Sequence, residues 1–183
     1  MKTFKPRIKA RLRKNRQTLN KNIDNFFGWI KGAKLVELKE CNTEEDPVRP
    51  ELDNEFRTGY GRKIYGVEYQ EEIHAVMCFA YTNKIPKSVE ELEKLSTDAF
   101  LQSAMRDQAG GQIAIAYTVW SKKKGGGKLI VKEVFKKIKK SNHLNRLVTL
   151  SPLTEIATKF HTRNGAKLVQ INETTQNFEY KVL

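Results

Sequence analysis

The sequence is poor in cysteine, and the two that it has, Cys41 and Cys78, are far apart and lack metal-ligand spacing. A disulfide-rich secreted domain is therefore not indicated, and a reducing, cytoplasmic setting is the simplest interpretation. No apolar run approaches the roughly 20 residues that span a bilayer. The N-terminus is basic, but no apolar segment follows it, so a secretory signal is not supported. We expect neither a metal site nor a membrane partner.

Acidic residues are also scarce relative to basic ones. The chain of 183 residues has 34 Lys and Arg against 21 Asp and Glu, which gives a formal net charge of +13. Such an excess favours a polyanionic partner, whether nucleic acid, a ribosome or an anionic cofactor. Hydrophobic residues make up 39% of the chain, which is ordinary for a globular protein. The length suits one domain with a sizeable core.

The basic residues are concentrated in two regions, of which the first is the N-terminal arm, residues 1–39. This arm carries nine Lys and Arg residues before its first acid, Asp24. Apolar residues recur at three- and four-residue spacing, which predicts that part of the arm is helical. Its charge predicts contact with nucleic acid or a ribosome. The remainder, residues 40–183, is expected to form the folded domain.

Hydrophobic periodicity predicts mixed α and β structure in this domain. Residues 41–62 are rich in turn signals and prolines and are predicted to be irregular. Two apolar runs around a short polar turn predict an antiparallel hairpin over residues 63–82. Further elements are expected in chain order: a short helix over 88–95, a strand over 112–120, a helix after Gly127, a strand over 145–150, a helix capped by Ser151 or Thr154 and ending near Arg163, and a terminal hairpin over 166–182.

The second basic region is a glycine turn between the strand at 112–120 and an amphipathic helix. Its residues are Lys122, Lys123, Lys124, Gly125, Gly126, Gly127 and Lys128. Glycines let the backbone approach a ligand closely, and N–H groups at a helix start converge on an anion. The turn therefore predicts a phosphate site, with a flexible basic loop as the alternative. The P-loop and the dinucleotide fingerprint both fit poorly, because their spacing and flanking residues are missing.

Residues 112–166 resemble the core of the GCN5-related N-acetyltransferase (GNAT) family. That family carries Gln/Arg-x-x-Gly-x-Gly/Ala after its fourth strand, and Lys122-x-x-Gly125-x-Gly127 stands in the same register. A later family helix has the form Asn-x-x-Ala-x-x-Phe/Leu-Tyr-x-x-x-Gly-Phe. The corresponding residues are Thr154, Ala157, Phe160, His161, Gly165 and Ala166, with every interval kept. The departures are Lys122 for Gln/Arg, Thr154 for Asn, His161 for Tyr and Ala166 for Phe.

The resemblance implies an α+β, three-layer fold, with a mixed, mostly antiparallel central sheet, splayed middle strands and flanking helices. It also implies that acetyl-CoA or another acyl-CoA binds here. The backbone of Tyr117, Thr118 and Val119 would pair with the pantetheine arm, and N–H groups from Lys122 to Lys128 would hold the pyrophosphate. Thr154 stands at a cofactor-contacting position of the family.

The activity implied by the resemblance is acyl-CoA-dependent N-acyl transfer to an amine. His161 stands where the family often has a tyrosine that protonates the departing thiolate, and an imidazole can act as a general acid or base. A polar helix residue without a catalytic duty is the other interpretation of His161. The alternative function is a non-catalytic binding protein of GNAT-like fold, associated with nucleic acid or with an assembly such as a virion.

Overall fold

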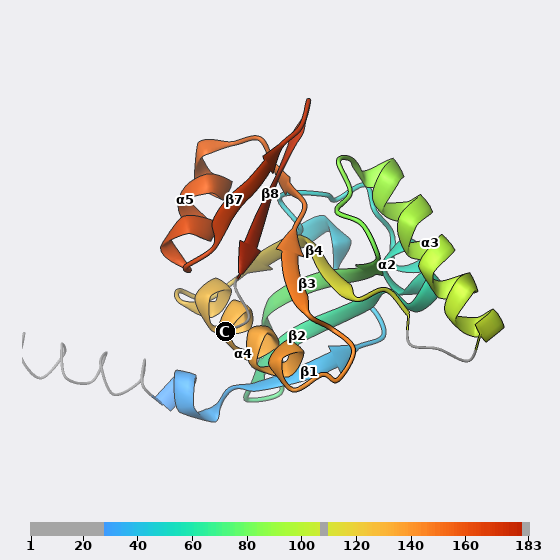
Figure 1. Cartoon of the computed structure of the whole chain (residues 1–183). Coiled ribbons are helices and arrows are strands. Elements are labelled where there is room, and N and C mark those ends of the chain that lie inside the picture. Colours follow the sequence, from blue (N-terminus) through green and yellow to red (C-terminus); the bar gives the residue numbers. More distant parts are fainter. Residues whose placement is uncertain (1–27, 107–109, 181–183) are drawn as a thin grey trace, which may run out of the picture. The chain divides into compact units, whose positions relative to one another are not determined.

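The computed structural model describes residues 28–106 and 110–180 (Figure 1). The chain divides into two units, residues 1–34 and 35–183. In the first unit residues 28–32 are helical, and the rest of the predicted helical arm lies outside the described residues. The second unit begins at Leu35, and strand β1, Lys34–Leu38, belongs to the sheet. The functional boundary between arm and domain near residue 40 stays a prediction.

The larger unit is built on one eight-stranded sheet with the order β1-β2-β3-β4-β5-β8-β6, in which β7 pairs with β8. After β1 the strands are β2 Lys63–Tyr69, β3 Glu72–Thr82, β4 Ile113–Ser121, β5 Arg146–Thr149, β6 Ser151–Pro152, β7 Lys167–Ile171 and β8 Thr175–Tyr180. β4 and β5 run parallel, whereas β2/β3, β3/β4 and the three pairs that include β8 run antiparallel. The predicted mixed, mostly antiparallel sheet is confirmed.

The predicted hairpin over residues 63–82 is present as β2 and β3. Its register pairs Lys63 with Phe79 and Tyr69 with Glu72. Gln70 and Glu71 connect the strands with φ angles of 53° and 65°. Two successive positive φ values match the right-handed twist of the flanking strands, which is why a polar two-residue turn suffices here.

Among the described residues of the larger unit, four helices accompany the sheet: α2 Asn54–Thr58, α3 Val89–Arg106, α4 Gly126–Lys139 and α5 Glu155–Arg163. Residues 41–62, predicted to be irregular, contain α2 and two 3-10 turns, Thr43–Glu45 and Gly59–Gly61. Asp53 begins α2 by accepting a hydrogen bond of 2.7 Å from the N–H of Phe56. α3 starts as predicted, with Ser88 accepting from the N–H of Glu91, but continues well beyond Leu95.

α3 and α4 cover opposite faces of the sheet, as the alternation of side chains along β3 shows. Leu92 of α3 shares a core cluster with Cys78 and Ala80. Ala75, on the other face of β3, lies against the start of α4, where a Cβ added to Gly126 would be 3.3 Å from its own. Helix, sheet and helix therefore form three layers, and the two helices lie on different sides of the strands in Figure 1.

Candidate active site

The site originates in a β-bulge in β4. Cys78 of β3 faces Thr118 and Phe79 faces Ala116, so Tyr117 is an extra residue in β4. The parallel pairing with β5 ends at Ala116, which faces Thr149. A bulge bends the strand that carries it. Beyond Ala116, β4 consequently runs on while β5 departs, and the predicted splay of the middle strands is confirmed.

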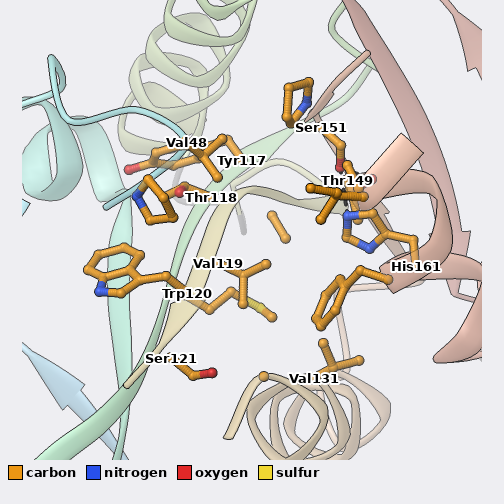
Figure 2. A pocket seen from close by; sticks show the side chains of 18 of the residues that line it. Val48, Tyr117, Thr118, Val119, Trp120, Ser121, Val131, Thr149, Ser151 and His161 are labelled. Atoms are coloured by element: carbon orange, nitrogen blue, oxygen red, sulfur yellow. Dashed lines mark hydrogen bonds between the residues drawn. The ribbon is translucent and has the colours of Figure 1, made fainter. Parts of the chain in front are cut away.

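A pocket of about 540 Å³ occupies the space where β4 and β5 part (Figure 2). β4 forms one wall, α4 contributes Gly127 and Val131, and α5 contributes Phe160 and His161. Val119 points into the pocket towards His161 in Figure 2. Within the described chain, the lining residues include no Asp, Glu, Lys or Arg. The pocket is a mostly apolar cleft, and its polar side-chain groups are hydroxyls, the Trp120 indole and one imidazole.

The three glycines at the start of α4 are each favoured by a different structural constraint. Gly125 is the N-cap of α4 with φ of 86°, a left-handed conformation that favours glycine. A Cβ on Gly126 would lie 3.0 Å from that of Ser121, and a Cβ on Gly127 would lie 3.1 Å from the Phe160 ring. The absence of side chains therefore lets the start of α4 pack closely against the sheet at Gly126 and against α5 at Gly127. Of the three glycines, Gly127 lines the pocket.

The N–H groups of this turn are only partly used by the protein. Lys122 N–H donates to His74 O at 2.9 Å, and Gly126 N–H donates to Lys123 O at 2.9 Å. In the described chain, the N–H groups of Gly127 and Lys128 have no backbone acceptor, as expected in the first turn of a helix. Together with the helix dipole, such groups form an anion site. The residues fit a pyrophosphate, although the N–H groups of Lys122 and Gly126 are already engaged.

The predicted lysines of the turn have different surroundings. Lys122 forms an ion pair of 2.7 Å with Glu45, and Lys123 Nζ lies 4.8 Å from the centre of the Tyr69 ring. Lys124 and Lys128 are exposed. Lys122 is exposed too, but its ammonium group is paired with Glu45, so those of Lys124 and Lys128 are better placed to meet an anion that arrives from solvent.

The three β4 residues predicted to flank the cofactor all line the pocket, but their side chains differ in role. Tyr117 is buried in the core, with its ring 5.8 Å from that of Phe56 in an edge-to-face arrangement. Burial raises the pKa of its phenol far above the ordinary value. Thr118 donates to the carboxylate of Asp46, and Val119 faces the cavity. Pairing of their backbone with a pantetheine remains a prediction.

His161 lies at the far wall of the pocket in a hydrogen-bonded chain. Its Nε2 is 2.7 Å from Ser151 Oγ, and its Nδ1 is 2.9 Å from the hydroxyl of Tyr180. Ser151 Oγ in turn lies 3.1 Å from Thr149 Oγ1. Burial lowers the pKa of His161 to about 4, so its ring is neutral near pH 7. One ring nitrogen then donates while the other accepts.

Sequence reasoning missed Ser151 and Tyr180 as members of the site. The sequence offers Ser151 and Thr154 as alternative helix caps, and Thr154 holds that position, accepting from the N–H of Ala157 at 3.3 Å. Since Thr154 caps α5, the hydroxyl of Ser151 is available to His161. A serine ten residues before the histidine, at a strand end, is the only sequence signal for this pair.

No family model matches the sequence, and neither does any curated protein. Solved structures do match. The GNAT-like decarboxylase GphF, in complex with isobutyryl-CoA, superposes with a TM-score of 0.62 at 10% identity, covering 82% of this chain and 100% of that one. The loading GNATL domain of CurA from Lyngbya majuscula gives a TM-score of 0.57 at 13% identity, covering 81% and 97%. The chain has the GNAT fold.

A Bacillus subtilis acetyltransferase in complex with CoA shows the same fold, with a TM-score of 0.56 at 14% identity and coverage of 82% and 99%. The glycine turn of the present chain lies between β4 and α4, and the residues from Thr154 to Gly165 form α5 and its ends. The two segments that carried the sequence resemblance thus meet at the pocket of a GNAT fold.

Two further findings concern the described residues only. They contain no group of three or more His, Cys, Asp and Glu side chains arranged to hold a metal ion. None of their helices combines the length and the apolar character needed to cross a bilayer.

Proposed function

We propose that this chain is an acyl-CoA-dependent N-acyltransferase that uses acetyl-CoA or another acyl-CoA and an amine acceptor. The observation that carries the proposal is the parting of β4 from β5 beside a glycine turn with unused N–H groups. The pantetheine arm would pair with the backbone from Tyr117 to Val119, where β5 has left β4. The pyrophosphate would meet the N–H groups of Gly127 and Lys128, with Thr154 at the pocket wall. The fold neighbours that carry CoA or isobutyryl-CoA support this placement.

The protein's contribution to such a transfer is mainly position and exclusion of water. The bound thioester supplies the activated acyl group. A β4 backbone N–H can polarise its carbonyl, while Ser151 Oγ can give a proton to the leaving sulfur. His161 Nε2 can then resupply Ser151, and the Tyr180 hydroxyl can resupply Nδ1, since the three groups are in hydrogen-bond contact. The proton that the attacking amine loses returns to Tyr180 through water, so that the transfer releases no net proton and leaves no phenolate. His161 would therefore act as a neutral relay rather than as an imidazolium acid.

Thermal unfolding with and without acetyl-CoA tests the binding part of this proposal. A ligand at a hundred times its Kd stabilises the folded state by about 2.7 kcal/mol. We expect acetyl-CoA and CoA to raise the Tm of the wild type, and Gly127→Glu to abolish the rise. Gly28→Glu is the control, because it adds the same charge where a Cβ meets no neighbour within 4 Å. Absence of any shift in the wild type would refute the cofactor site.

A second candidate reaction is decarboxylation of a carboxyacyl-CoA. It is favoured by the contact of 2.7 Å between Ser151 and His161 and by the uncharged lining of the pocket, since loss of CO₂ is easier from a carboxylate removed from water. GphF, described as a GNAT-like decarboxylase, has a similar fold. In this reaction the C–C bond to the carboxylate breaks and CO₂ leaves. The electron pair remains on the thioester enolate, which takes a proton from Ser151.

One assay distinguishes acyl transfer from decarboxylation. With malonyl-CoA and no amine present, a decarboxylase releases CO₂ and forms acetyl-CoA, whereas a transferase consumes acetyl-CoA only when an amine is added. If the protein binds CoA but catalyses neither acyl transfer nor decarboxylation, its function would be the alternative one, that of a non-catalytic binding protein with the GNAT fold.

We also propose that the basic N-terminal arm contacts nucleic acid or a ribosome. Most of the arm, residues 1–27, lies outside the described residues, and the proposal is supported by its charge alone. Phosphate contacts by Lys and Arg release counterions, so affinity should fall steeply with salt. RNA and DNA binding of the full chain and of a chain lacking residues 1–20 should be compared over a salt series. Equal affinity of the two chains would refute the role of the arm.

A further inference from the structure

Asp46 links two parts of the chain that are 72 residues apart. The residue is 1% exposed, and both of its carboxylate oxygens accept from Thr118 Oγ1 at 2.8 Å. Oδ1 also accepts from the N–H groups of Val48 at 2.9 Å and Arg49 at 3.2 Å. One buried carboxylate therefore holds a loop to the middle strand of the sheet.

Arg57 completes this arrangement from α2. Its Nη2 donates to Asp46 Oδ2 at 2.9 Å and to the carbonyl of Arg49 at 2.8 Å, and both side chains of the ion pair are fully buried. Its Nε donates to the carbonyl of Leu52 at 2.8 Å. Buried ion pairs seldom add net stability over apolar packing, but removal of one partner leaves an uncompensated charge. A role in geometry explains the pair better than a role in stability.

The groups that Asp46 holds are at the pocket. Pro47 and Val48 follow Asp46 directly, and both line the cavity. Thr118 is the residue after the bulge, and Val119, which faces the cavity, comes next. Figure 2 shows Val48 beside Tyr117 and Thr118, at the end of the pocket away from α4. The carboxylate thus sets the spacing between the loop wall and β4.

We propose that Asp46 is a positioning residue for the acyl group. Through Thr118 and the N–H groups of Val48 and Arg49, it fixes the width of the pocket between the loop 47–49 and the bulged part of β4. The inference rests on the proposed function, because it assigns this end of the pocket to the acyl part of an acyl-CoA. The spacing then selects which acyl chains fit, while the CoA part is bound at the glycine turn.

The variant that tests this is Thr118→Val, which replaces the donor by a methyl group of similar size and leaves the Asp46 and Arg57 ion pair in place. Thr118→Ser is the matched control, because it keeps the hydroxyl. Val48→Ala shortens a half-buried side chain in the pocket wall. It therefore widens the same end of the pocket and leaves the hydrogen bonds of Asp46 in place. Substitution of Asp46 itself is avoided, because it would leave Arg57 buried without its counter-charge.

The full chain and these variants should be compared for the Kd of CoA, the Kd of acetyl-CoA and butyryl-CoA, and kcat and KM with both acyl-CoAs. We expect Thr118→Val to lower kcat/KM for acetyl-CoA about tenfold or more, while the Kd of CoA stays within about twofold. The preference for butyryl-CoA over acetyl-CoA should rise in Thr118→Val and in Val48→Ala, and Thr118→Ser should resemble the wild type.

Two results would overturn the inference. One is a Thr118→Val protein that matches the wild type in acyl preference and in kcat/KM. The other is a variant that weakens CoA and both acyl-CoAs by one common factor, which indicates general loosening of the fold. If the wild type itself binds neither CoA nor acyl-CoA, the proposed function fails first and the inference falls with it.

Discussion

Ser151 Oγ lies 2.7 Å from His161 Nε2 inside the pocket, although His161 departs from the GNAT pattern of the sequence and Ser151 lies outside that pattern. Both side chains are buried, and Tyr180 orients the imidazole from its other nitrogen. This is the geometry in which a hydroxyl group and a base exchange a proton. The first two predictions concern these residues.

Loss of the Ser151 hydroxyl or of the His161 imidazole should lower the rate of the reaction more than the affinity for CoA. We expect Ser151→Ala and His161→Phe to lower kcat by about a hundredfold, because a positioned proton donor typically contributes 10²–10⁴-fold. The Kd of CoA should change little, since its proposed phosphate site is at the other end of the pocket. Release of CoA with an amine, or of CO₂ from malonyl-CoA, provides the measurement. The control is Ser103→Ala, because Ser103 is on α3 and outside this pocket. Full activity of Ser151→Ala would exclude the proton relay.

Stability should depend on pH through His161. Burial holds its pKa at about 4, whereas an unfolded histidine has a pKa of about 6.5. Between these values the unfolded chain binds a proton that the folded chain does not, so the free energy of unfolding falls as the pH falls from about 6.5 to about 4. The loss is on the order of 3 kcal/mol for this group. Urea unfolding at pH 7.0 and 4.5 measures it. His161→Gln should show a smaller loss than the wild type, and an equal loss would contradict the assignment.

The glycine turn offers a test that separates strain from ligand binding. Gly125 and Gly165 have φ angles of 86° and 88°. An alanine at either position must adopt a left-handed conformation, which costs about 1–2 kcal/mol. Gly125→Ala and Gly165→Ala should therefore be destabilised to a similar extent in urea. Only Gly125→Ala should also weaken CoA binding, because Gly165 ends α5 away from the turn. Equal CoA affinity of the two variants would argue against the turn as the phosphate site.

Cys41 should be the reactive thiol of the pair. A hydrogen bond from Cys78 lowers the pKa of Cys41 to about 7. Burial acts in the opposite direction, and the charge of Arg57 lowers the pKa further. Burial raises the pKa of Cys78, which is fully buried. Alkylation by iodoacetamide should thus modify Cys41 first, with a rate that is half-maximal near pH 7. Cys78→Ala removes the donor and should raise the pKa of Cys41, which slows the reaction at pH 7. First labelling at Cys78 would contradict this.

Much of the fold was predictable because it follows from local patterns. The alternation of residues 63–82 identified the hairpin, and Ser88 with Glu91 marked the start of α3. The glycine turn was recognisable because strand, glycines and amphipathic helix follow one another in the chain. The start of the helix after Ser151 was predicted as a choice of two caps, and only packing decides between them.

The rest depended on contacts between distant segments. Residues 41–62 are punctuated by prolines and turn residues, so α2 and the buried Asp46 and Arg57 pair have no periodic signal. Tyr180 joins His161 only because β8 pairs with β5. The bulge at Tyr117 exists only relative to β3, since a strand by itself has no register. Sequence patterns locate elements, whereas these features are properties of pairs of elements.

The bulge in β4 has a consequence for how this pocket can change during evolution. The parting of β4 from β5 depends on the number of residues in β4, whereas the side chain of Asp46 sets only the spacing between the loop 47–49 and β4. Replacement of Val119, Val131 or Phe160 would reshape the cavity, but deletion of Tyr117 would restore the register with β3 and remove the bend that separates β4 from β5. The separation of the two strands, which a residue count defines, can persist while the side chains that line it are replaced.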